Sequence, residues 1–123
     1  MKCLSIRQPW ANAIMFLGKD IENRTWPTHF RGDCLIHAGR LIDRDGDYFI
    51  RKLTGRGSGE VRTGGIIGIV EIVDCVTDSP SRWFFGEYGF VLRNPRPLPF
   101  IPYKGSLGFF DVPDSIVDNG VQP

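Results

Sequence analysis

The chain has 123 residues, of which 41% are hydrophobic, 24% charged and 12% aromatic, and its formal net charge is +1. This size and composition are typical of one soluble globular domain and exclude a disordered or fibrous chain. The small net charge argues against a protein that coats duplex nucleic acid through many phosphate contacts. It is compatible with a local basic cleft, because Lys and Arg outnumber Asp and Glu in residues 1–40.

The cysteines and the apolar runs indicate the cellular setting. Cys3, Cys34 and Cys75 are odd in number and far apart, so neither a disulfide framework nor a zinc site is expected. No segment resembles the apolar part of a signal peptide, and no run approaches the ~18 apolar residues of a membrane span. We therefore expect a reduced, cytoplasmic protein without membrane contact, metal or other cofactor.

The first predicted elements are a strand, a helix and a second strand. Cys3–Ile6 has the composition of a short strand. Pro9–Leu17 is predicted to be a helix, because proline suits the first helical position and the apolar residues recur at helical spacing. Gly18 is placed for a left-handed cap at its end. Asp20–Trp26 follows as a strand, and Pro27 ends it because proline has no N–H for a sheet ladder.

The remaining elements are predicted to be mostly strands. Cys34–Ala38 is a strand, Asp43–Leu53 is a candidate short helix, and the glycine-rich segment Thr54–Glu60 is expected to be a flexible surface loop. Gly64–Val76 is the strongest strand, and its nearly continuous apolar run predicts burial on both faces. Ser79–Pro80 is expected to begin a short helical turn. Further strands are expected at Tyr88–Leu92, Pro99–Ile101 and Ser106–Val112.

These elements together predict an α+β, mostly β protein, a small barrel of about six strands with two or three short helices. Residues 1–113 are expected to form the one domain. The polar residues 114–123 are expected to be a flexible C-terminal tail, because chain ends fray unless packing holds them.

Charged and aromatic side chains crowd together in residues 19–26. On a strand, alternation sends Glu22, Arg24 and Trp26 to one face, with the acid and the base roughly 7 Å apart. With Lys19 and Trp10 they would form the floor of a pocket where an aromatic ring stacks a base and charges contact its edge or a phosphate. The alternative is structural, with Glu22 and Arg24 paired as a salt bridge and Trp26 in the core. The spacing alone does not decide between the two.

A series of motifs runs along the chain: Leu4–Ala11, Gly18–Arg24, Arg31-Gly32 with Ile36–Ala38, Gly86–Leu92 and Lys104–Phe110. Together they resemble the ASCH domain family, in particular its small, stand-alone bacterial and phage members. The resemblance spans nearly all of residues 3–112 and implies a β-barrel related to the PUA fold of RNA-modification proteins. Its most specific part is Gly18-Lys19 followed by Glu22 and Arg24, between an amphipathic helix and a strand.

The resemblance implies a cleft between the helix and the barrel that accepts RNA, single-stranded nucleic acid, or a nucleotide or modified nucleoside. Lys19 would contact a phosphate, and Arg24 would make a planar contact or hold Glu22 in place. Glu22 would accept hydrogen bonds from an exocyclic amine or a ribose hydroxyl. In this hypothesis a ligand completes the pairing of the charges. The candidate binding residues are Gln8, Trp10, Lys19, Glu22, Arg24, Trp26, Lys104 and Ser106.

A small hydrolase acting at the same cleft is the alternative function. Some similar proteins remove an acyl group from a modified cytidine with a lysine and, three residues later, a threonine nucleophile. Glu22 occupies that place here, and Thr25 is expected to face the other way. If the chain is an enzyme, Lys19 would hold an oxyanion and Glu22 would activate water or a 2′-hydroxyl. Further candidates are Glu87 or His37 as a second acid–base group and Lys104 with Ser106 in a nuclease.

A protein-interaction adaptor that uses the same surface is a third function class left open. Among single residues, His37 alternates with apolar neighbours and is interpreted as a hydrogen-bonded barrel histidine. The aromatic cluster in residues 83–88 is expected to cover one end of the barrel, with Trp83 or Tyr88 as a candidate second stacking wall. Cys34 and Cys75 are expected to be small buried thiols.

Overall fold

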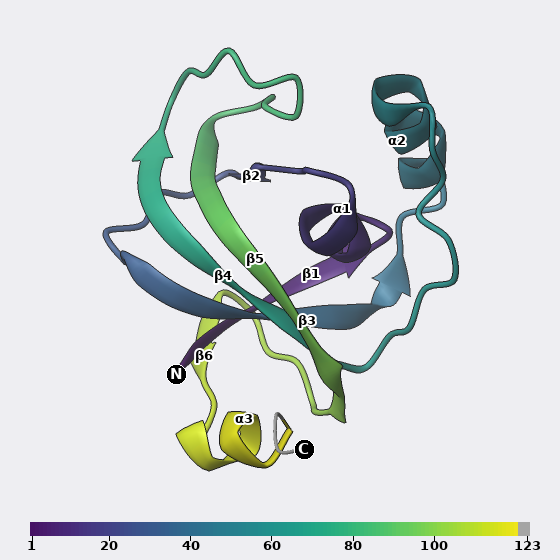
Figure 1. Cartoon of the computed structure of the whole chain (residues 1–123). Helices are drawn as coiled ribbons and strands as arrows, with labels where there is room; N and C mark the ends of the chain where they lie inside the picture. Colours follow the sequence, from purple (N-terminus) through teal and green to yellow (C-terminus); the bar gives the residue numbers. More distant parts are fainter. Residues whose placement is uncertain (121–123) are drawn as a thin grey trace.

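The computed structural model describes residues 1–120, which form six strands and three short helices (Figure 1). The prediction of a mostly β protein with two or three short helices is confirmed. The strands are β1 (Lys2–Gln8), β2 (Ile21–Arg24), β3 (Gly32–Ile42), β4 (Gly65–Val76), β5 (Tyr88–Pro102) and β6 (Phe109–Asp111). The helices are α1 (Trp10–Phe16), α2 (Gly46–Thr54) and α3 (Asp114–Gly120).

The strands form one mixed sheet in the order β2-β5-β4-β3-β1-β6. β1 and β3 are parallel, and every other neighbouring pair is antiparallel. Parallel neighbours need a crossover connection, which α1 and β2 provide here. The long strands β4 and β5 curve around α1, whereas α2 lies to one side of the sheet (Figure 1). The space between α1, α2 and β2 is where the candidate site lies.

Side chains bridge β2 and β6, which are the two edges of the sheet. Trp26, two residues beyond β2, packs edge-on against Phe109 of β6, with ring centroids 5.7 Å apart. Arg24 of β2 donates a hydrogen bond from Nη2 to the backbone oxygen of Ser5 in β1 over 3.0 Å. An unpaired strand edge exposes backbone hydrogen-bonding groups. These side-chain contacts bring the two edges of the sheet together and give it the shape of a barrel.

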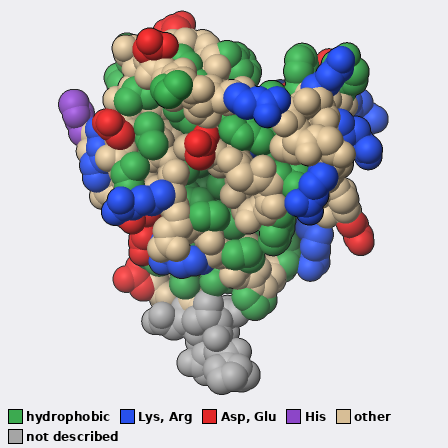
Figure 2. Space-filling view, turned by 45° about the horizontal axis from the view of Figure 1, so that its top comes forward, with side chains coloured by type: hydrophobic (Ala, Val, Ile, Leu, Met, Phe, Trp, Pro, Cys, Tyr) green, Lys and Arg blue, Asp and Glu red, His purple; other side chains and the backbone are tan. Residues whose placement is uncertain are grey.

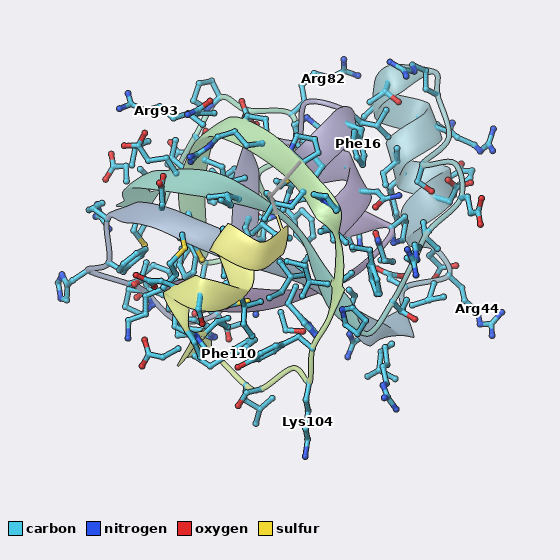
Figure 3. All side chains as sticks on the ribbon, turned by 60° about the horizontal axis from the view of Figure 1, so that its bottom comes forward. Phe16, Arg44, Arg82, Arg93, Lys104 and Phe110 are labelled. Atoms are coloured by element: carbon cyan, nitrogen blue, oxygen red, sulfur yellow. The ribbon has the colours of Figure 1, made fainter. Side chains whose placement is uncertain are left out.

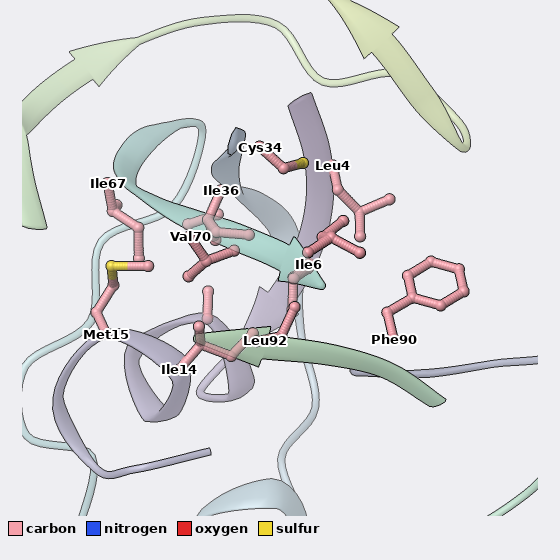
Figure 4. Packing of buried hydrophobic residues seen from close by; sticks show 13 residues of the cluster. Leu4, Ile6, Ile14, Met15, Cys34, Ile36, Ile67, Val70, Phe90 and Leu92 are labelled. Atoms are coloured by element: carbon pink, nitrogen blue, oxygen red, sulfur yellow. The ribbon is translucent and has the colours of Figure 1, made fainter. Parts of the chain in front are cut away.

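Helix α1 buries its apolar side against the inner face of the sheet. Ile14 and Met15 point toward apolar side chains of β4 and β5 (Figure 4). Gly68 of β4 allows this close approach, because a Cβ added there would collide with the Met15 side chain. The helix predicted for Pro9–Leu17 is confirmed to within one residue at each end.

The first half of β4 is buried on both faces, as its apolar run predicts. Every residue from Gly65 to Val70 is buried. Ile67 and Val70 belong to the cluster around α1, and Ile66 and Ile69 to a second apolar cluster. Strict alternation would separate Ile67 from Val70, so the irregularity of β4 beside Gly68 is what lets the two sets pack in different clusters. The sheet therefore needs a cover on its second face.

Helix α3 covers that second face, where the sequence predicts a frayed polar segment after Pro113. Val117 is 8% exposed and packs in the second cluster with Val112 and Leu35. Burial of these apolar groups offsets the entropy lost on ordering a short polar segment. The rest of the predicted flexible tail, residues 121–123, lies outside the described residues.

The sequence predicts two strands in residues 88–101, and this prediction is wrong. β5 runs without a break through Pro95, Pro97 and Pro99. The register of β4 against β5 shifts at three places, between Ile66 and Gly68, Ile69 and Glu71, and Ile72 and Asp74. Irregularities of this kind tolerate prolines, which cannot donate to an unbroken ladder.

Some other elements are shorter in the structure than the sequence predicts. β2 ends at Arg24, two residues early, and β6 covers only Phe109–Asp111. The short helical turn predicted from Ser79–Pro80 is a single turn that begins at Ser81, where the Phe84 N–H donates to the Ser81 carbonyl over 3.1 Å. In the part of the chain that the structure describes, no helix is long and apolar enough to cross a membrane.

The thiols lie mostly inside the barrel. Cys3 and Cys34 are fully buried, as predicted for Cys34, while Cys75 is half-buried. Burial raises the pKa of the Cys3 thiol to about 12 and also raises the pKa of Cys34. Both thiols are therefore protonated at neutral pH and act as small apolar groups.

Candidate functional site

The turn after α1 brings charged side chains together. Gly18 has φ +78°, a left-handed conformation that glycine adopts at little cost, which confirms the predicted cap. The chain reverses there, and the Lys19 N–H donates to the Ala13 carbonyl over 3.1 Å. β2 then places Glu22 and Arg24 beside the Lys19 side chain.

Lys19, Glu22 and Arg24 form a closed ion triad. Lys19 Nζ donates to Glu22 Oε1 over 3.0 Å and to the Ile21 carbonyl. Arg24 Nε donates to Glu22 Oε2 over 3.1 Å, and Arg24 Nη2 lies 3.0 Å from the same oxygen. Lys19 and Glu22 are only 5% and 8% exposed. Glu22 and Arg24 thus share a face, as alternation predicts.

The internal pairing of the ion triad contradicts the hypothesis that a ligand completes it. Every buried side-chain nitrogen and oxygen in the described residues has a hydrogen-bond partner. An isolated buried charge is so costly that the chain must neutralise it by itself. The alternative in which Glu22 and Arg24 pair as a salt bridge is therefore confirmed. A ligand that binds here would contact an ion triad whose charges are already paired.

A first cavity of about 430 Å³ lies against the ion triad, between α1, α2 and the segment that precedes β5. Phe49 and Phe85 in its wall are 54% and 69% exposed, which is unusual for phenylalanine. The aromatic residues that line it are Trp10, Phe49, Trp83 and Phe85. The charged residues that line it are Lys19, Glu22, Lys52 and Arg82.

A second cavity of about 730 Å³ lies on the other side of Trp10. Trp10, Glu22 and Asn23 line both cavities, so the two lie side by side. Trp10 Nε1 donates to Asp43 Oδ2 over 2.9 Å, which fixes the indole between them. The charged residues that line the second cavity are Arg7, Glu22, Arg24, Arg40 and Asp43.

A third cavity of about 690 Å³ extends the series along β1 and β3. It shares Ser5, Gly39 and Arg40 with the second cavity. Lys104 is the other charged residue in its lining. Arg82 and Lys104 extend into solvent from opposite edges of the molecule (Figure 3). The three cavities therefore lie next to one another in a series across the molecule, and we call this series the path.

This path is basic although the chain is nearly neutral. Seven of the fifteen Lys and Arg residues line it, against two of the fourteen Asp and Glu residues. Lys and Arg side chains gather on the α2 side of the molecule, at the right of Figure 2. The seven cations are Arg7, Lys19, Arg24, Arg40, Lys52, Arg82 and Lys104, and the two acids are Glu22 and Asp43.

Most of the predicted binding residues line one of the three cavities, but they do not all line the same one. Trp10 and Glu22 stand where the first two cavities join, whereas Lys104 lies at the far end in the third. Trp26 fits both of its predicted positions, because it lines the second cavity and also packs against the core. Lys19 lines the first cavity, and Arg24 and Ser106 line the second.

Gln8 is the predicted binding residue that the structure removes from the cleft. It is fully buried, and its Nε2 donates to Asn12 Oδ1 over 2.8 Å and to the Arg62 carbonyl over 3.0 Å. Asn12 in turn donates to the carbonyls of Ser58 and Glu60. Gln8 therefore anchors the glycine-rich loop to α1, and burial keeps it away from any ligand.

The structure also tests the predictions for Thr25, for the second stacking wall and for the second acid–base group. Thr25 lines the second cavity, although alternation predicts that it faces away from Glu22, because the strand stops at Arg24 and alternation ends with it. Trp83 lines the first cavity, as expected for a second stacking wall, while Tyr88 is not among the lining residues. Glu87 is exposed and lies outside all three cavities.

Several lining residues could not be identified from sequence. Phe49 and Lys52 come from α2, Arg82 and Phe85 from the irregular segment before β5, and Arg40 from the end of β3. Each lies in a mixed-polarity context that is typical of a solvated surface. Only the position of α2 and of the loops in space reveals them.

His37 is a hydrogen-bonded barrel histidine, as predicted. It is 2% exposed, and its ring nitrogens contact Ser5 Oγ at 3.0 Å and the Tyr103 carbonyl at 2.7 Å. Among residues 1–120, no group of three His, Cys, Asp or Glu side chains is placed to hold a metal ion.

Comparisons with known proteins agree with this architecture. A family model described as the ASCH domain matches residues 4–107. Crystal structures of ASCH from Zymomonas mobilis and of a mutant of it are both 14% identical to the chain, with TM-scores of 0.55 and 0.59. They cover 95% and 96% of this chain and 90% and 94% of their own. At this identity the likeness shows a common fold.

The curated relatives are larger proteins. Activating signal cointegrator 1 from Homo sapiens is 26% identical over 139 aligned positions, and the protein of that name from Mus musculus is 25% identical. Each alignment covers 98% of this chain but 23% of the relative. The chain thus spans under a quarter of the length of these relatives.

Proposed function

Since the chain belongs to the ASCH domain family, with its PUA-like fold, we propose that it binds RNA, single-stranded nucleic acid or a nucleotide in the charged cleft between α1 and the barrel. The cleft consists of the first and second cavities. The observation that carries this proposal is the junction at Trp10 of an aromatic cavity with a cation-lined one. A nucleotide has the same two parts, an aromatic base and an anionic phosphate.

The first cavity suits an unstacked base. Phe49, Trp83 and Phe85 offer ring surfaces, and bases stack on such rings with little dependence on sequence. At about 430 Å³ the cavity has the size of a small-molecule site, so a base must leave its stack to enter. This requirement favours a single strand or a free nucleotide over a duplex.

Glu22 can recognise a base edge without disturbing the ion triad. A carboxylate offers about four acceptor sites, and Lys19 and Arg24 use only some of them. One lone pair of Oε1 is left for an exocyclic amine or a ribose hydroxyl. The role of Lys19 and Arg24 is then to hold the acceptor in place, in contrast to the direct phosphate contact first expected.

In this proposal, the exposed cations around the cleft contact the phosphates. Arg7, Arg40, Lys52 and Arg82 are exposed and take part in none of the ion pairs found among the described residues. Cations without an acidic partner are available to release counterions from a nucleic-acid backbone. The binding is therefore expected to be strongly salt-dependent.

The geometry favours binding over hydrolysis at this cleft. A hydrolase would need Lys19 to donate to an oxyanion, but two of the three N–H groups of its ammonium already donate to Glu22 and to the Ile21 carbonyl. Glu22 is likewise already paired with both Lys19 and Arg24. If the cleft instead binds a peptide, as an adaptor would, the affinity should depend little on salt.

The test is a salt titration of binding to a fluorescently labelled single-stranded RNA, read by anisotropy. Replacing Arg40 and Arg82 together by alanine should weaken binding and reduce the slope of log K against log salt by about 1.4, because each phosphate that is no longer neutralised lowers the slope by ~0.7. The control replaces Arg31 and Arg93 by alanine, which changes the net charge equally but at surface ion pairs with Asp74 and Glu71.

The control variant should bind RNA as the unmodified protein does. Equal losses in both double variants would show that only net charge matters and would contradict a defined cleft. The absence of measurable binding to RNA and to nucleotides at low salt would rule out the proposed function.

A further inference from the structure

Ser5 and His37 form a polar pair to which the proposed nucleic-acid binding assigns no role. They stand opposite each other on the parallel strands β1 and β3. Ser5 Oγ lies 3.0 Å from His37 Nδ1, and His37 Nε2 lies 2.7 Å from the Tyr103 carbonyl oxygen. A carbonyl can only accept, so Nε2 carries a hydrogen, and in the neutral form of the ring Nδ1 then presents its lone pair to the Ser5 hydroxyl.

This arrangement has the parts of an activated nucleophile. A serine hydroxyl donates to an imidazole nitrogen, and a third group on the far side of the ring fixes its tautomer and orientation. Burial holds His37 rigidly, since it is 2% exposed and packs edge-on against Phe110 at a centroid distance of 6.0 Å.

The Ser5 side of the pair opens onto two of the cavities. Ser5 lines both the second and the third. A Cβ added at Gly39 would lie 3.0 Å from Ser5 Oγ, and one added at Gly105 would lie 3.2 Å from it. Glycine at these two positions therefore leaves room around the hydroxyl that any other residue would fill.

The charge around the third cavity indicates what it would accept. Arg40 and Lys104 are the charged residues in its lining, and both are exposed. Neither takes part in an ion pair found among residues 1–120. A molecule with a carboxylate or phosphate would be attracted here and held beside Ser5.

We propose that Ser5 and His37 are a catalytic pair that hydrolyses an ester carrying a negative charge, at the third cavity. Ser5 Oγ attacks the ester carbonyl carbon while its proton passes to His37 Nδ1. The ester C–O bond then breaks, and the leaving alkoxide takes that proton from His37. Water gives a proton to Nδ1 and attacks the acyl group on Ser5, which releases the carboxylic acid and restores the hydroxyl. This activity does not depend on nucleic-acid binding.

The first test is labelling of the unmodified protein with a fluorophosphonate, which reacts with activated serines. Peptide mass spectrometry should find the adduct at Ser5 and not at Ser115, a serine hydroxyl exposed on α3 that serves as the matched control. Because this readout needs no variant, it stays decisive even where a substitution in β1 prevents folding. An unlabelled Ser5 in the folded protein would overturn the proposal.

The second test compares hydrolysis of p-nitrophenyl acetate with that of mono-p-nitrophenyl succinate, which carries a carboxylate. Turnover should fall by about a hundredfold or more in Ser5→Ala and in His37→Gln, the contribution typical of nucleophile and base, and should not change in Ser115→Ala. The succinate ester should react faster at low salt. Turnover that survives in Ser5→Ala would overturn the catalytic pair, and equal rates for the two esters would overturn the assigned charge preference.

Discussion

Replacing Glu22 by alanine is expected to lower the free energy of unfolding by about 3–5 kcal/mol. The change leaves Lys19 buried at 5% exposure without its acid and removes the acceptor that holds Arg24. Arg24 also donates to the Ser5 carbonyl, so a loosened guanidinium weakens the closure between β2 and β1. Urea unfolding followed by tryptophan fluorescence measures the effect.

The matched control for Glu22 is Glu71, which also lies on a strand and pairs with an arginine. Arg93 Nε and Nη2 donate to the two Glu71 carboxylate oxygens over 3.0 Å and 3.2 Å, but this pair is exposed. Solvent screens such a pair, so Glu71→Ala should cost about 0–1 kcal/mol. Similar losses for Glu22→Ala and Glu71→Ala would contradict the view that the ion triad is a buried structural unit.

Replacing Phe49 by alanine should raise the Kd for single-stranded RNA or a nucleotide roughly fivefold to 150-fold. The expected change corresponds to about 1–3 kcal/mol for one base stacked on one ring. Phe49 lines the first cavity and is 54% exposed, so its removal takes away a binding surface at little cost to the core. The affinity is measured by anisotropy, and the melting temperature is recorded in parallel.

Tyr48 is the matched control for Phe49, because it precedes it on α2 and is 60% exposed but does not line the cavity. The two rings contact each other, with centroids 5.7 Å apart, so a disturbance of the helix would appear in both variants. Tyr48→Ala should leave the Kd unchanged. A Kd that rises equally in both variants would point to a damaged α2 and away from base stacking.

Local patterns predicted the elements near the site well. Helical spacing located α1, the glycine after it located the cap, and strand alternation put Glu22 beside Arg24. The apolar run of β4 correctly predicted burial on two faces. Each of these signals is contained within about a dozen residues and needs no knowledge of the rest of the fold.

Features that depend on distant contacts were not predictable in the same way. The register shifts that let β5 pass its prolines involve β4, and α3 is ordered by burial against the second face of the sheet. The glycine-rich loop is tied down by Gln8 and Asn12, more than forty positions earlier in the chain. In each case tertiary packing overrides a local polar or proline signal.

In the candidate site, too, local features could be predicted from the sequence and long-range contacts could not. The sequence places Lys19, Glu22 and Arg24 together but does not reveal that they neutralise each other inside the chain. Phe49 and Lys52 belong to a helix that the sequence predicts, yet nothing in its spacing indicates that α2 would stand across from Trp83. The aromatic cavity exists only because three separate segments converge there.

The most direct measurement is an amide chemical-shift titration of the labelled protein with a nucleoside monophosphate and with a short single-stranded RNA. If the cleft binds the base, shifts should concentrate at the Trp10 indole N–H and in residues 49–53 and 82–85, with α3 unaffected. The longer RNA should extend them toward Arg40. Saturable shifts that fall on α3 or the outer face of the sheet, with residues 49–53 and 82–85 unchanged, would contradict nucleic-acid recognition at this cleft.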